Sequence, residues 1–545
     1  MGQYHTRCNL SAARFPFVST FHGRSVILPQ HDINFQKSAT FGGADQDRDV
    51  GIPQLFYLHN VMPTEQGYQS VGFNTQILPM LGETDFDQVI TLQDVDGNKF
   101  LWSPGFGNNY VFDAPTLAWD KVSSIAGLET DVLVTHAFVQ GVHYIFYEKT
   151  GCFVYNSTTK AFDSVTLTGL TVGNIVGIIG SNGYLLAWDI NNVLYWTPIP
   201  PDFTPSLITG ASSASITDLK GRIVTAHQAT NGFIIYSTGN AVGASFTGNI
   251  RFPFNLKEIA GSGGVRHKEH ISSEANLDVH YALTSAGLQE LTKTSSKLVL
   301  AEVTDFLTNR TFEDYNSATK IFTTSYLSTD LAFKLVIVGS RYLVLSYGAT
   351  IGSFTHALVF DFLQKKWGKL KVNHTDCFEY TYPNLYGIVT YEMLEALGTT
   401  YDELLDTTYN DLNSIVATAE RPRRTIGFLQ QDGTIKITIF DGGRLEDDAL
   451  IMFGRYQFTR GHNLQLLGLE VENVEAGSNY ACYIFPSFDG KNFETPYIPS
   501  LRTPVGQLRF YKCRKTAVNH TIVFTGSFNL VSTQIHYAPA GQIRI

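Results

Sequence analysis

The sequence predicts an all-β protein built around a β-propeller, and three observations support this prediction. A strand-rich unit recurs at least six times between residues 87 and 372. In each unit an apolar, aromatic strand meets a Gly, Asn or Asp turn, a second strand follows, and several units end on Trp or Phe. Charged residues make up only 16% of the chain, whereas Phe (38), Tyr (27) and Gly (47) are abundant, a mixture that favours pleated, half-buried surfaces with frequent turns. Such units cannot bury both faces alone, so they are expected to stack radially.

We expect three domains along the chain. Residues 1–86 show few regular alternations and many turn signals, which indicates an N-terminal arm or platform that packs on a neighbouring domain or subunit. Residues 87–442 carry the repeated units, and we predict about seven blades, with six or eight as alternatives. Residues 443–545 alternate apolar and polar side chains cleanly, with about eight strands in 100 residues, as expected for a C-terminal β-sandwich.

The blades are expected at residue ranges that follow the repeat: 87–122, 131–169, 172–206, 216–258, 262–303 and 330–372, with a last blade split between 376–390 and 422–441. The last blade contains a clear hairpin at 425–440, around Asp432 and Gly433, because Asp-Gly favours tight turns. The split is made by the only convincing helical stretch, an insertion at 391–420 that repeats TTYDEL as TTYNDL. A loop of this length in a compact domain indicates contact with a partner.

Composition excludes several classes of protein. The formal net charge of −10 leaves no broad positive surface for gripping phosphate. The five cysteines are scattered and contain no C-x-x-C pair, so we expect buried free thiols and neither a disulfide framework nor a structural zinc site. The sequence contains no 18-residue apolar run and no signal peptide. We therefore expect a protein made in a reducing cytoplasm and not inserted into a membrane.

No motif for catalysis or for a cofactor stands out. Asp45, Asp47 and Asp49 have the alternating carboxylates of a calcium loop but lack its glycine and terminal Glu, so a solvated acidic loop explains them better. G-x-S-x-G, the P-loop and H-E-x-x-H are all absent from the sequence. We therefore predict no catalytic residues, no cofactor and no bound metal, and we expect the protein not to be an enzyme.

Two further sets of residues have both a functional and a structural interpretation. Arg266, His267, Lys268 and His270 lie in the run GSGGVRHKEHIS, which is either an exposed polar loop at a subunit contact or a solvated connection between blades. The aromatic residues that end the units could form a sugar-stacking row, but equivalent positions in separate blades favour packing between blades instead. These residues are Trp119, Phe162, Trp196, Phe254 and Trp367.

Several long sequence segments, taken together, resemble structural proteins of short-tailed bacteriophages. They lie at 43–73, 232–266, 340–380 and 454–494. The chain resembles the tail nozzle or tail hub family, whose members contain a β-propeller and form a ring below the head-to-tail adaptor. The resemblance implies a virion structural protein, assembled in the cytoplasm of a bacterial host and located in the tail. It also implies a homo-oligomer, commonly a hexamer, that continues the DNA channel, helps to retain the genome and anchors fibres or spikes.

The acid excess suits such a conduit, because an acidic or neutral lumen lets double-stranded DNA pass without specific binding. We expect the acidic loops to line the lumen or a subunit contact. The candidate residues are Asp45, Asp47, Asp49, Asp402, Glu403, Asp406 and Asp411.

Two alternatives remain at the level of sequence. The first is a lectin-like tail protein that recognises host-surface carbohydrate, with residues 443–545 as the binding part. The second is a propeller glycosidase, which would need two carboxylates facing each other in one cleft.

Overall fold

The computed structural model divides into two compact units. The propeller unit comprises Val71–Glu446, and the sandwich unit combines Met1–Ser70 with Asp447–Ile545. The residues that the structure describes are 18–21, 24–27, 30–34, 55–75, 88–93, 99–104, 108–113, 118–124, 134–156, 159, 161–273, 278–300, 311–316, 321–326, 332–381, 424–439, 449–456, 462–473, 480–487, 495–505 and 508–542.

Within the described residues, the propeller unit contains seven blades of four antiparallel strands, and successive strands pair in chain order within almost every blade. Blade 1 consists of β8 (Ile90–Gln93), β9 (Lys99–Pro104), β10 (Asn108–Asp113) and β11 (Ala118–Ser124). Blade 2 consists of β12 (Val134–Val139), β13 (Val142–Tyr147), β14 (Gly151–Asn156) and β15 (Ala161–Val165). Blade 3 consists of β16 (Ile175–Ser181), β17 (Tyr184–Asp189), β18 (Val193–Thr197) and β19 (Ser212–Ser215).

Blades 4 to 6 repeat this arrangement. Blade 4 consists of β20 (Ile223–Ala229), β21 (Gly232–Ser237), β22 (Ala241–Phe246) and β23 (Phe254–Glu258). Blade 5 consists of β24 (Ile271–Ser273), β25 (His280–Thr284), β26 (Gly287–Leu291) and β27 (Ser296–Leu298). Blade 6 consists of β30 (Ala332–Val338), β31 (Tyr342–Thr350), β32 (Ser353–Asp361) and β33 (Lys366–His374).

Blade 7 is closed by a strand from far away in the sequence. It consists of β34 (Asp376–Thr381), β35 (Arg424–Leu429) and β36 (Ile435–Ile439), followed by β7 (Gly72–Thr75). β7 pairs antiparallel with β36, with Gly72 opposite Ile439. Residues 72–75 fall within the predicted N-terminal arm (1–86), since four residues carry no local signal for a partner more than 350 positions away.

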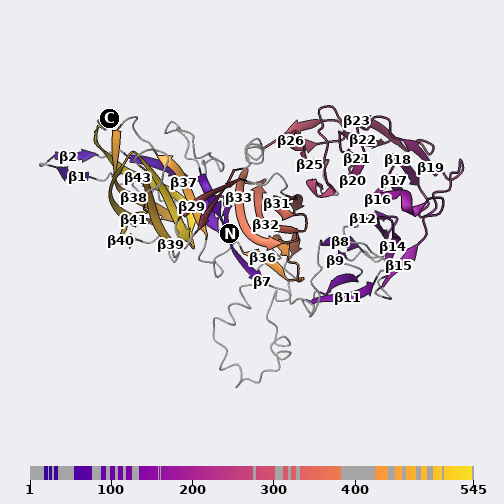
Figure 1. Cartoon of the computed structure of the whole chain (residues 1–545), viewed down its shortest axis with the longest axis horizontal. Coiled ribbons are helices and arrows are strands. Elements are labelled where there is room, and N and C mark those ends of the chain that lie inside the picture. Colours follow the sequence, from indigo (N-terminus) through magenta and orange to yellow (C-terminus); the bar gives the residue numbers. More distant parts are fainter. Residues whose placement is uncertain are drawn as a thin grey trace, which may run out of the picture. The chain divides into compact units, whose positions relative to one another are not determined.

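Each blade packs on the next, and the last packs on the first. Buried clusters join blades 1 and 2, blades 2 and 3, blades 3 and 4, and blades 4 and 5. The backbone N–H of Ile337 donates to the Ser272 hydroxyl between blades 5 and 6, and the His374 ring meets Phe428 between blades 6 and 7. Blades 7 and 1 share a cluster, and Figure 1 shows the blades in chain order around a ring. The predicted all-β fold with a β-propeller is therefore confirmed.

The aromatic residues that end the units pack within and between blades, and the three tryptophans among them are buried whereas Phe162 and Phe254 are half-buried. Trp119, Trp196 and Trp367 are buried, and the Trp119 indole N–H donates to the carbonyl of Gly433, which joins blade 1 to blade 7. Phe162 packs on Trp102 of blade 1, and Phe254 packs on Tyr184 of blade 3. Gly433 lies in the predicted Asp-Gly turn with a positive φ of 82°.

Three smaller elements complete the described part of the propeller unit. They are the 3₁₀ turns η2 (Val172–Asn174) and η3 (Lys268–His270), and a hairpin of β28 (Thr311–Asn316) and β29 (Ile321–Tyr326). The predicted helical insertion at 391–420 lies outside the described residues. Across the described residues of both units, no helix has the length and hydrophobicity that are needed to cross a lipid bilayer.

The sandwich unit has two sheets around one core. The first sheet has the order β4 (Leu55–His59), β37 (Leu450–Tyr456), β42 (Asn519–Gly526) and β39 (Tyr480–Ser487). The second contains β5 (Val61–Pro63), β6 (Tyr68–Ser70), β43 (Asn529–Gln542), β38 (His462–Asn473), β41 (Leu508–Ala517) and β40 (Ser500–Val505). β3 (Gln30–Asn34) also pairs with β43, and β1 (Val18–Phe21) forms a hairpin with β2 (Arg24–Ile27).

Apolar side chains from both sheets share the sandwich core. Ile451 and Phe524 come from the first sheet, and Leu469 and Ile535 come from the second. The N-terminal strands β3 to β6 belong to this unit, so the C-terminal half-buried strands predicted from the sequence are completed by strands from the start of the chain. Four cysteines among the described residues are buried free thiols, as predicted: Cys152, Cys377, Cys482 and Cys513.

Candidate functional site

Four charged side chains form a chain of ion pairs that joins three blades. We call Lys268, Glu269, Lys334 and Asp376 the interblade charge chain. Lys334, on β30 of blade 6, lies 2.9 Å from Glu269 in η3, which leads into blade 5, and 2.8 Å from Asp376 at the start of β34 in blade 7. Lys268 lies 3.7 Å from Glu269. The side chains of Lys334, Glu269 and Asp376 are only 9%, 14% and 4% exposed, so their charges are largely removed from water.

Backbone amides fix the carboxyl group of Asp376. The N–H of Val89, immediately before β8, donates to Oδ2 at 2.8 Å, and the N–H of Cys377 donates to Oδ1 at 2.7 Å. The first of these bonds ties blade 7 to blade 1. The interblade charge chain thus runs from blade 5 across the place where the propeller closes.

The three buried groups shift one another's pKa values. Burial acts against the charge of Lys334, but the carboxylates of Asp376 and Glu269 prevail and raise its pKa. Burial likewise acts to raise the pKa of Glu269, yet Lys334 and Lys268 lower it to about 2. For Asp376 burial prevails over the attraction of Lys334, and its pKa is raised. Glu269 is therefore the ionised carboxylate of the pair, and Asp376 is the one that holds a proton more readily.

Histidines also link neighbouring blades. His227, on β20 of blade 4, lies 2.9 Å from the hydroxyl of Ser273 on β24 of blade 5. His280, on β25, is fully buried and contacts blade 4 twice. Its Nδ1 lies 2.8 Å from the Tyr236 hydroxyl and its Nε2 lies 2.9 Å from the carbonyl of Gln228. Because a carbonyl only accepts, Nε2 carries the proton and Nδ1 accepts from Tyr236.

Burial keeps these histidines neutral. It lowers the pKa of His280 to about 4. Burial, together with repulsion from the protonated forms of His280 and His136, lowers the pKa of His227 to about 3. His374 is buried between blades 6 and 7, with Nε2 2.7 Å from the Ser346 hydroxyl and Nδ1 2.8 Å from the carbonyl of Val372, and burial lowers its pKa to about 4. A neutral imidazole is thus part of the packing at each of these places.

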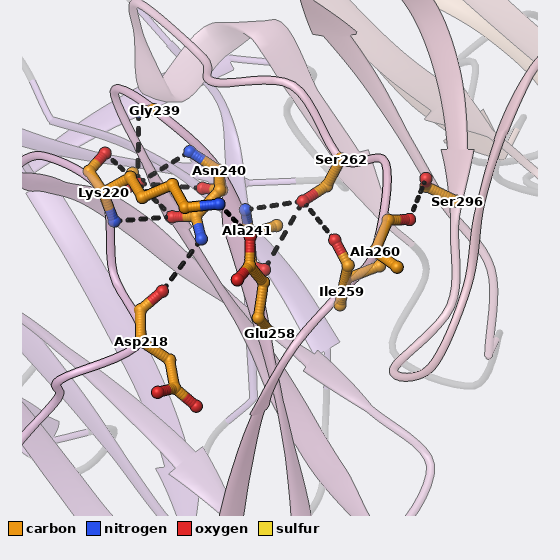
Figure 2. Close-up of polar contacts among 11 residues, drawn as sticks. Asp218, Lys220, Gly239, Asn240, Ala241, Glu258, Ile259, Ala260, Ser262 and Ser296 are labelled. Atoms are coloured by element: carbon orange, nitrogen blue, oxygen red, sulfur yellow. Dashed lines mark hydrogen bonds and ion pairs between the residues drawn. The ribbon is translucent and has the colours of Figure 1, made fainter.

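A second polar network fixes the turns at blade 4 (Figure 2). Asn240 is 2% exposed. Its Oδ1 accepts from the backbone N–H of Lys220 at 2.8 Å, and its Nδ2 donates to the carbonyl of Asp218 at 2.9 Å. The Ser262 hydroxyl accepts from the N–H of Ala241 and donates to the carbonyl of Ile259. These bonds attach both the connection that enters blade 4 and the connection that leaves it to the turn between β21 and β22.

The same region carries one exposed ion pair. Lys220 Nζ lies 2.5 Å from Glu258, and these side chains are 66% and 39% exposed. Surface pairs of this kind contribute little to stability, because water and salt screen them. The pair therefore provides a comparison for the buried interblade charge chain.

Two loops present apolar side chains to solvent. We call residues 199–211 of blade 3 and residues 246–252 of blade 4 the apolar loop pair, since each range lies at the connection between the third and fourth strands of its blade. The exposed side chains are Ile199 (55%), Leu207 (79%), Ile208 (94%), Phe246 (36%), Ile250 (58%) and Phe252 (68%).

The two loops touch and are internally braced. A Cβ added at Gly210 would lie 2.4 Å from Cγ2 of Ile250, so the loops are in direct contact. The Ser206 hydroxyl accepts from the N–H of Ile208, and the Thr247 hydroxyl donates to the carbonyl of Phe252. The apolar tips are thus held on ordered turns, which is the usual character of an interaction surface.

The sequence-predicted loop at 266–270 is less exposed than expected. Arg266 is exposed, whereas His267, Lys268 and His270 are half-buried, because η3 carries Glu269 toward Lys334. The loop thus connects two blades, and its predicted role in a subunit contact remains a prediction. The acidic candidates Asp45, Asp47, Asp49, Asp402, Glu403, Asp406 and Asp411 lie outside the described residues.

The interblade charge chain has no signature in the sequence. Lys334 and Asp376 lie in separate strand-like segments without any motif, and only the stacking of blades 5, 6 and 7 brings them to Glu269. Within the described residues, no three His, Cys, Asp or Glu side chains converge in a way that could hold a metal ion. The buried polar groups described above instead contact one another across blade boundaries.

Comparisons with known proteins give fold-level likenesses only. No protein-family model matches the chain, and no curated protein matches it. The solved structure of YCF48 bound to a D1 peptide aligns with a TM-score of 0.36 and 9% identity over 70% of this chain and 98% of that chain. BamB from Moraxella catarrhalis aligns with a TM-score of 0.34 and 9% identity over 70% of this chain and 94% of that one. The WD40 propeller domain of Doa1 aligns with a TM-score of 0.37 and 9% identity over 69% of this chain and 99% of that chain.

Proposed function

We propose that the protein is a structural component of a bacteriophage tail, of the nozzle or hub type. The observation that carries this proposal is that the buried ionisable groups described above hold neighbouring blades together. Lys334, Glu269, Asp376, His280 and His374 make contacts between neighbouring blades or pack where blades meet, which suits a rigid building block. The resemblance of four long phrases in the sequence to tail proteins of short-tailed phages supports the same role.

In this role the protein forms a ring, with six copies as the expected number, and the ring continues the DNA channel below the head-to-tail adaptor. It helps to retain the genome, and its outer surface anchors fibres or spikes in the tail of the virion. The net charge of −10 lets double-stranded DNA pass without being bound.

The apolar loop pair is the surface that we assign to the contact between copies. Two copies that each carry a charge of −10 repel each other, so a contact is favoured where the local charge is balanced. Residues 199–211 contain a single charged residue, Asp202, and residues 246–252 contain a single one of opposite sign, Arg251. Large exposed aliphatic and aromatic side chains next to a balanced pair of charges match the composition of interface cores.

Imaging of the purified full-length protein by negative-stain electron microscopy tests the proposed function. We expect rings with a central hole of at least about 20 Å, the width of a DNA duplex, and co-purification with the adaptor protein. Particles that remain monomeric at every concentration and with the adaptor present would contradict a ring-forming conduit.

Replacing Ile208 by Asp should weaken the contact between copies. Its side chain is 94% exposed, so the substitution leaves the fold intact but places a charge within the apolar loop pair. We expect the apparent dissociation constant of the oligomer, measured by analytical ultracentrifugation, to rise by roughly tenfold or more, as for loss of a central contact residue.

Leu363→Asp serves as the matched control, because Leu363 is also exposed, at 72%, but lies on blade 6. We expect this variant to assemble as the wild-type chain does. Equal assembly of Ile208→Asp and wild type would exclude the apolar loop pair from the contact, while leaving ring formation itself to be judged by imaging.

A further inference from the structure

We propose that Lys334 and Asp376 become joined by an isopeptide bond inside the folded propeller, with Glu269 as the general acid and base. The product is an amide between Nζ of Lys334 and Cγ of Asp376. It ties β30 of blade 6 covalently to β34 of blade 7.

The reacting groups are already in contact. Nζ of Lys334 lies 2.8 Å from Oδ1 of Asp376, and that oxygen is one bond from the carbon that the amine would attack. Nζ also lies 2.9 Å from Oε2 of Glu269, which is within reach for proton transfer. Groups held in contact by the fold react as if at very high concentration, so even a slow condensation becomes feasible.

Burial provides the second requirement. The three side chains are between 4% and 14% exposed, so little water is present to stabilise separated charges or to reverse the condensation. The raised pKa of Asp376 favours the protonated carboxyl that condensation requires. Glu269, whose pKa is lowered to about 2, is an ionised carboxylate in contact with the ammonium group, and because the pKa of Lys334 is raised, proton transfer between them is expected to be the slow step.

A backbone N–H group also stabilises the carboxyl group that the amine attacks. Oδ2 of Asp376 accepts from the N–H of Val89 at 2.8 Å, so this amide stabilises the negative charge that develops on Oδ2 during attack. Oδ1, the oxygen nearest to Nζ, is the one that leaves. Because β34 and β30 are the innermost strands of adjacent blades, neither group can move far from the other.

The reaction balances without any oxidant or additional reactant. Glu269 takes one proton from the Lys334 ammonium, and the neutral amine attacks Cγ of protonated Asp376, forming the C–N bond. Glu269 then delivers this proton to the Oδ1 hydroxyl and receives the second proton from Nζ. The C–Oδ1 bond breaks, and one water molecule leaves. Lys⁺, Glu⁻ and protonated Asp thus become an amide, a protonated Glu and water.

The ion pair of Lys220 and Glu258 lacks the burial that we propose the reaction requires. Their atoms are also in contact, at 2.5 Å, but the side chains are 66% and 39% exposed, and water solvates both groups. We expect no bond at that pair, which makes it an internal control in the same protein.

The intact mass of the purified full-length wild-type protein, measured under denaturing conditions, tests the proposal. We expect a mass lower than the sequence mass by one water molecule. Tryptic digestion should yield a branched peptide that contains Lys334 and Asp376, with no cleavage after Lys334, while Lys220 and Glu258 are found in ordinary linear peptides. The full sequence mass after prolonged incubation of folded protein, with Lys334 and Asp376 in separate peptides, would overturn the proposal.

Three variants separate the roles. Lys334→Arg should show its full mass because the nucleophile is lost. Glu269→Gln should also show its full mass, or a bond that forms far more slowly. Asp376→Asn should lose ammonia instead of water and reach the same final mass as the cross-linked wild type. A fully cross-linked Glu269→Gln protein would exclude Glu269 as the acid and base, and the wild-type peptide map remains decisive if a variant does not fold.

Discussion

Replacing Lys334 by Met should lower the free energy of unfolding of the propeller unit by about 3–5 kcal/mol relative to protein in which Lys334 and Asp376 are not yet joined, the usual cost of removing one partner from a buried ion pair. Lys334 is 9% exposed and lies between Glu269 and Asp376. Without it, two carboxyl groups face each other away from water with no cation between them. Urea unfolding followed by tryptophan fluorescence measures the change, because Trp119 and Trp367 are buried in this unit.

The exposed pair supplies the control for this prediction. Lys220→Met removes a lysine from an ion pair of similar distance, but its side chain is 66% exposed, so we expect a change below about 1 kcal/mol. Adding Glu269→Gln and Asp376→Asn to Lys334→Met removes the uncompensated charges and should recover part of the loss. Equal unfolding midpoints for the Lys334 and Lys220 variants would show that the interblade charge chain does not stabilise the propeller unit.

Lowering the pH from 7 to 5 should destabilise the propeller unit through its buried histidines. The pKa of His280 is about 4 in the folded protein and returns to about 6.5 on unfolding. Between these values the unfolded chain binds a proton that the folded chain does not, so the stability is complete above pH 6.5 and is lost as the pH falls toward 4. One such histidine accounts for on the order of 2 kcal/mol at pH 5, and His374, also at about 4, adds a similar loss.

Urea unfolding curves at pH 7, 6 and 5 check the sign and the source of this effect. His280→Gln keeps a neutral polar side chain between Tyr236 and Gln228, so it should lower stability at pH 7 but reduce the loss between pH 7 and pH 5. His374→Gln should act in the same way at the boundary of blades 6 and 7. An unchanged pH dependence in both variants would assign the acid sensitivity to other groups.

The propeller could be predicted because its signal is local and repeated. Most blades are meanders of strands that are adjacent in sequence, and several end on bulky side chains such as Trp119 and Trp367 that must be buried. The hairpin around Gly433 could also be predicted, since a positive φ at that position follows from the Asp-Gly dipeptide. These features depend on residues that are close in sequence, so they can be recognised from the sequence alone.

The candidate site could not be predicted in the same way. Glu269, Lys334 and Asp376 stand more than 40 residues from one another, and each looks like an ordinary charged residue near a strand end. In the loop at 266–270 the histidines are the noticeable residues in the sequence, whereas Glu269 makes the contact with Lys334 of blade 6. No spacing rule could show this, because the contact depends on the rotation from one blade to the next.

By itself, the sequence determined that this is an all-β protein with stacked aromatic-rich units, a second alternating region and buried thiols, because hydrophobic patterning and turn residues act over a few positions. Only the tertiary structure decided that β7 closes the ring, that β3 to β6 complete the sandwich unit, and that Lys334 is enclosed by two carboxyl groups. Each of these features depends on strand pairing or ion pairs between distant segments. Such interactions contribute to stability only after folding has brought the segments together.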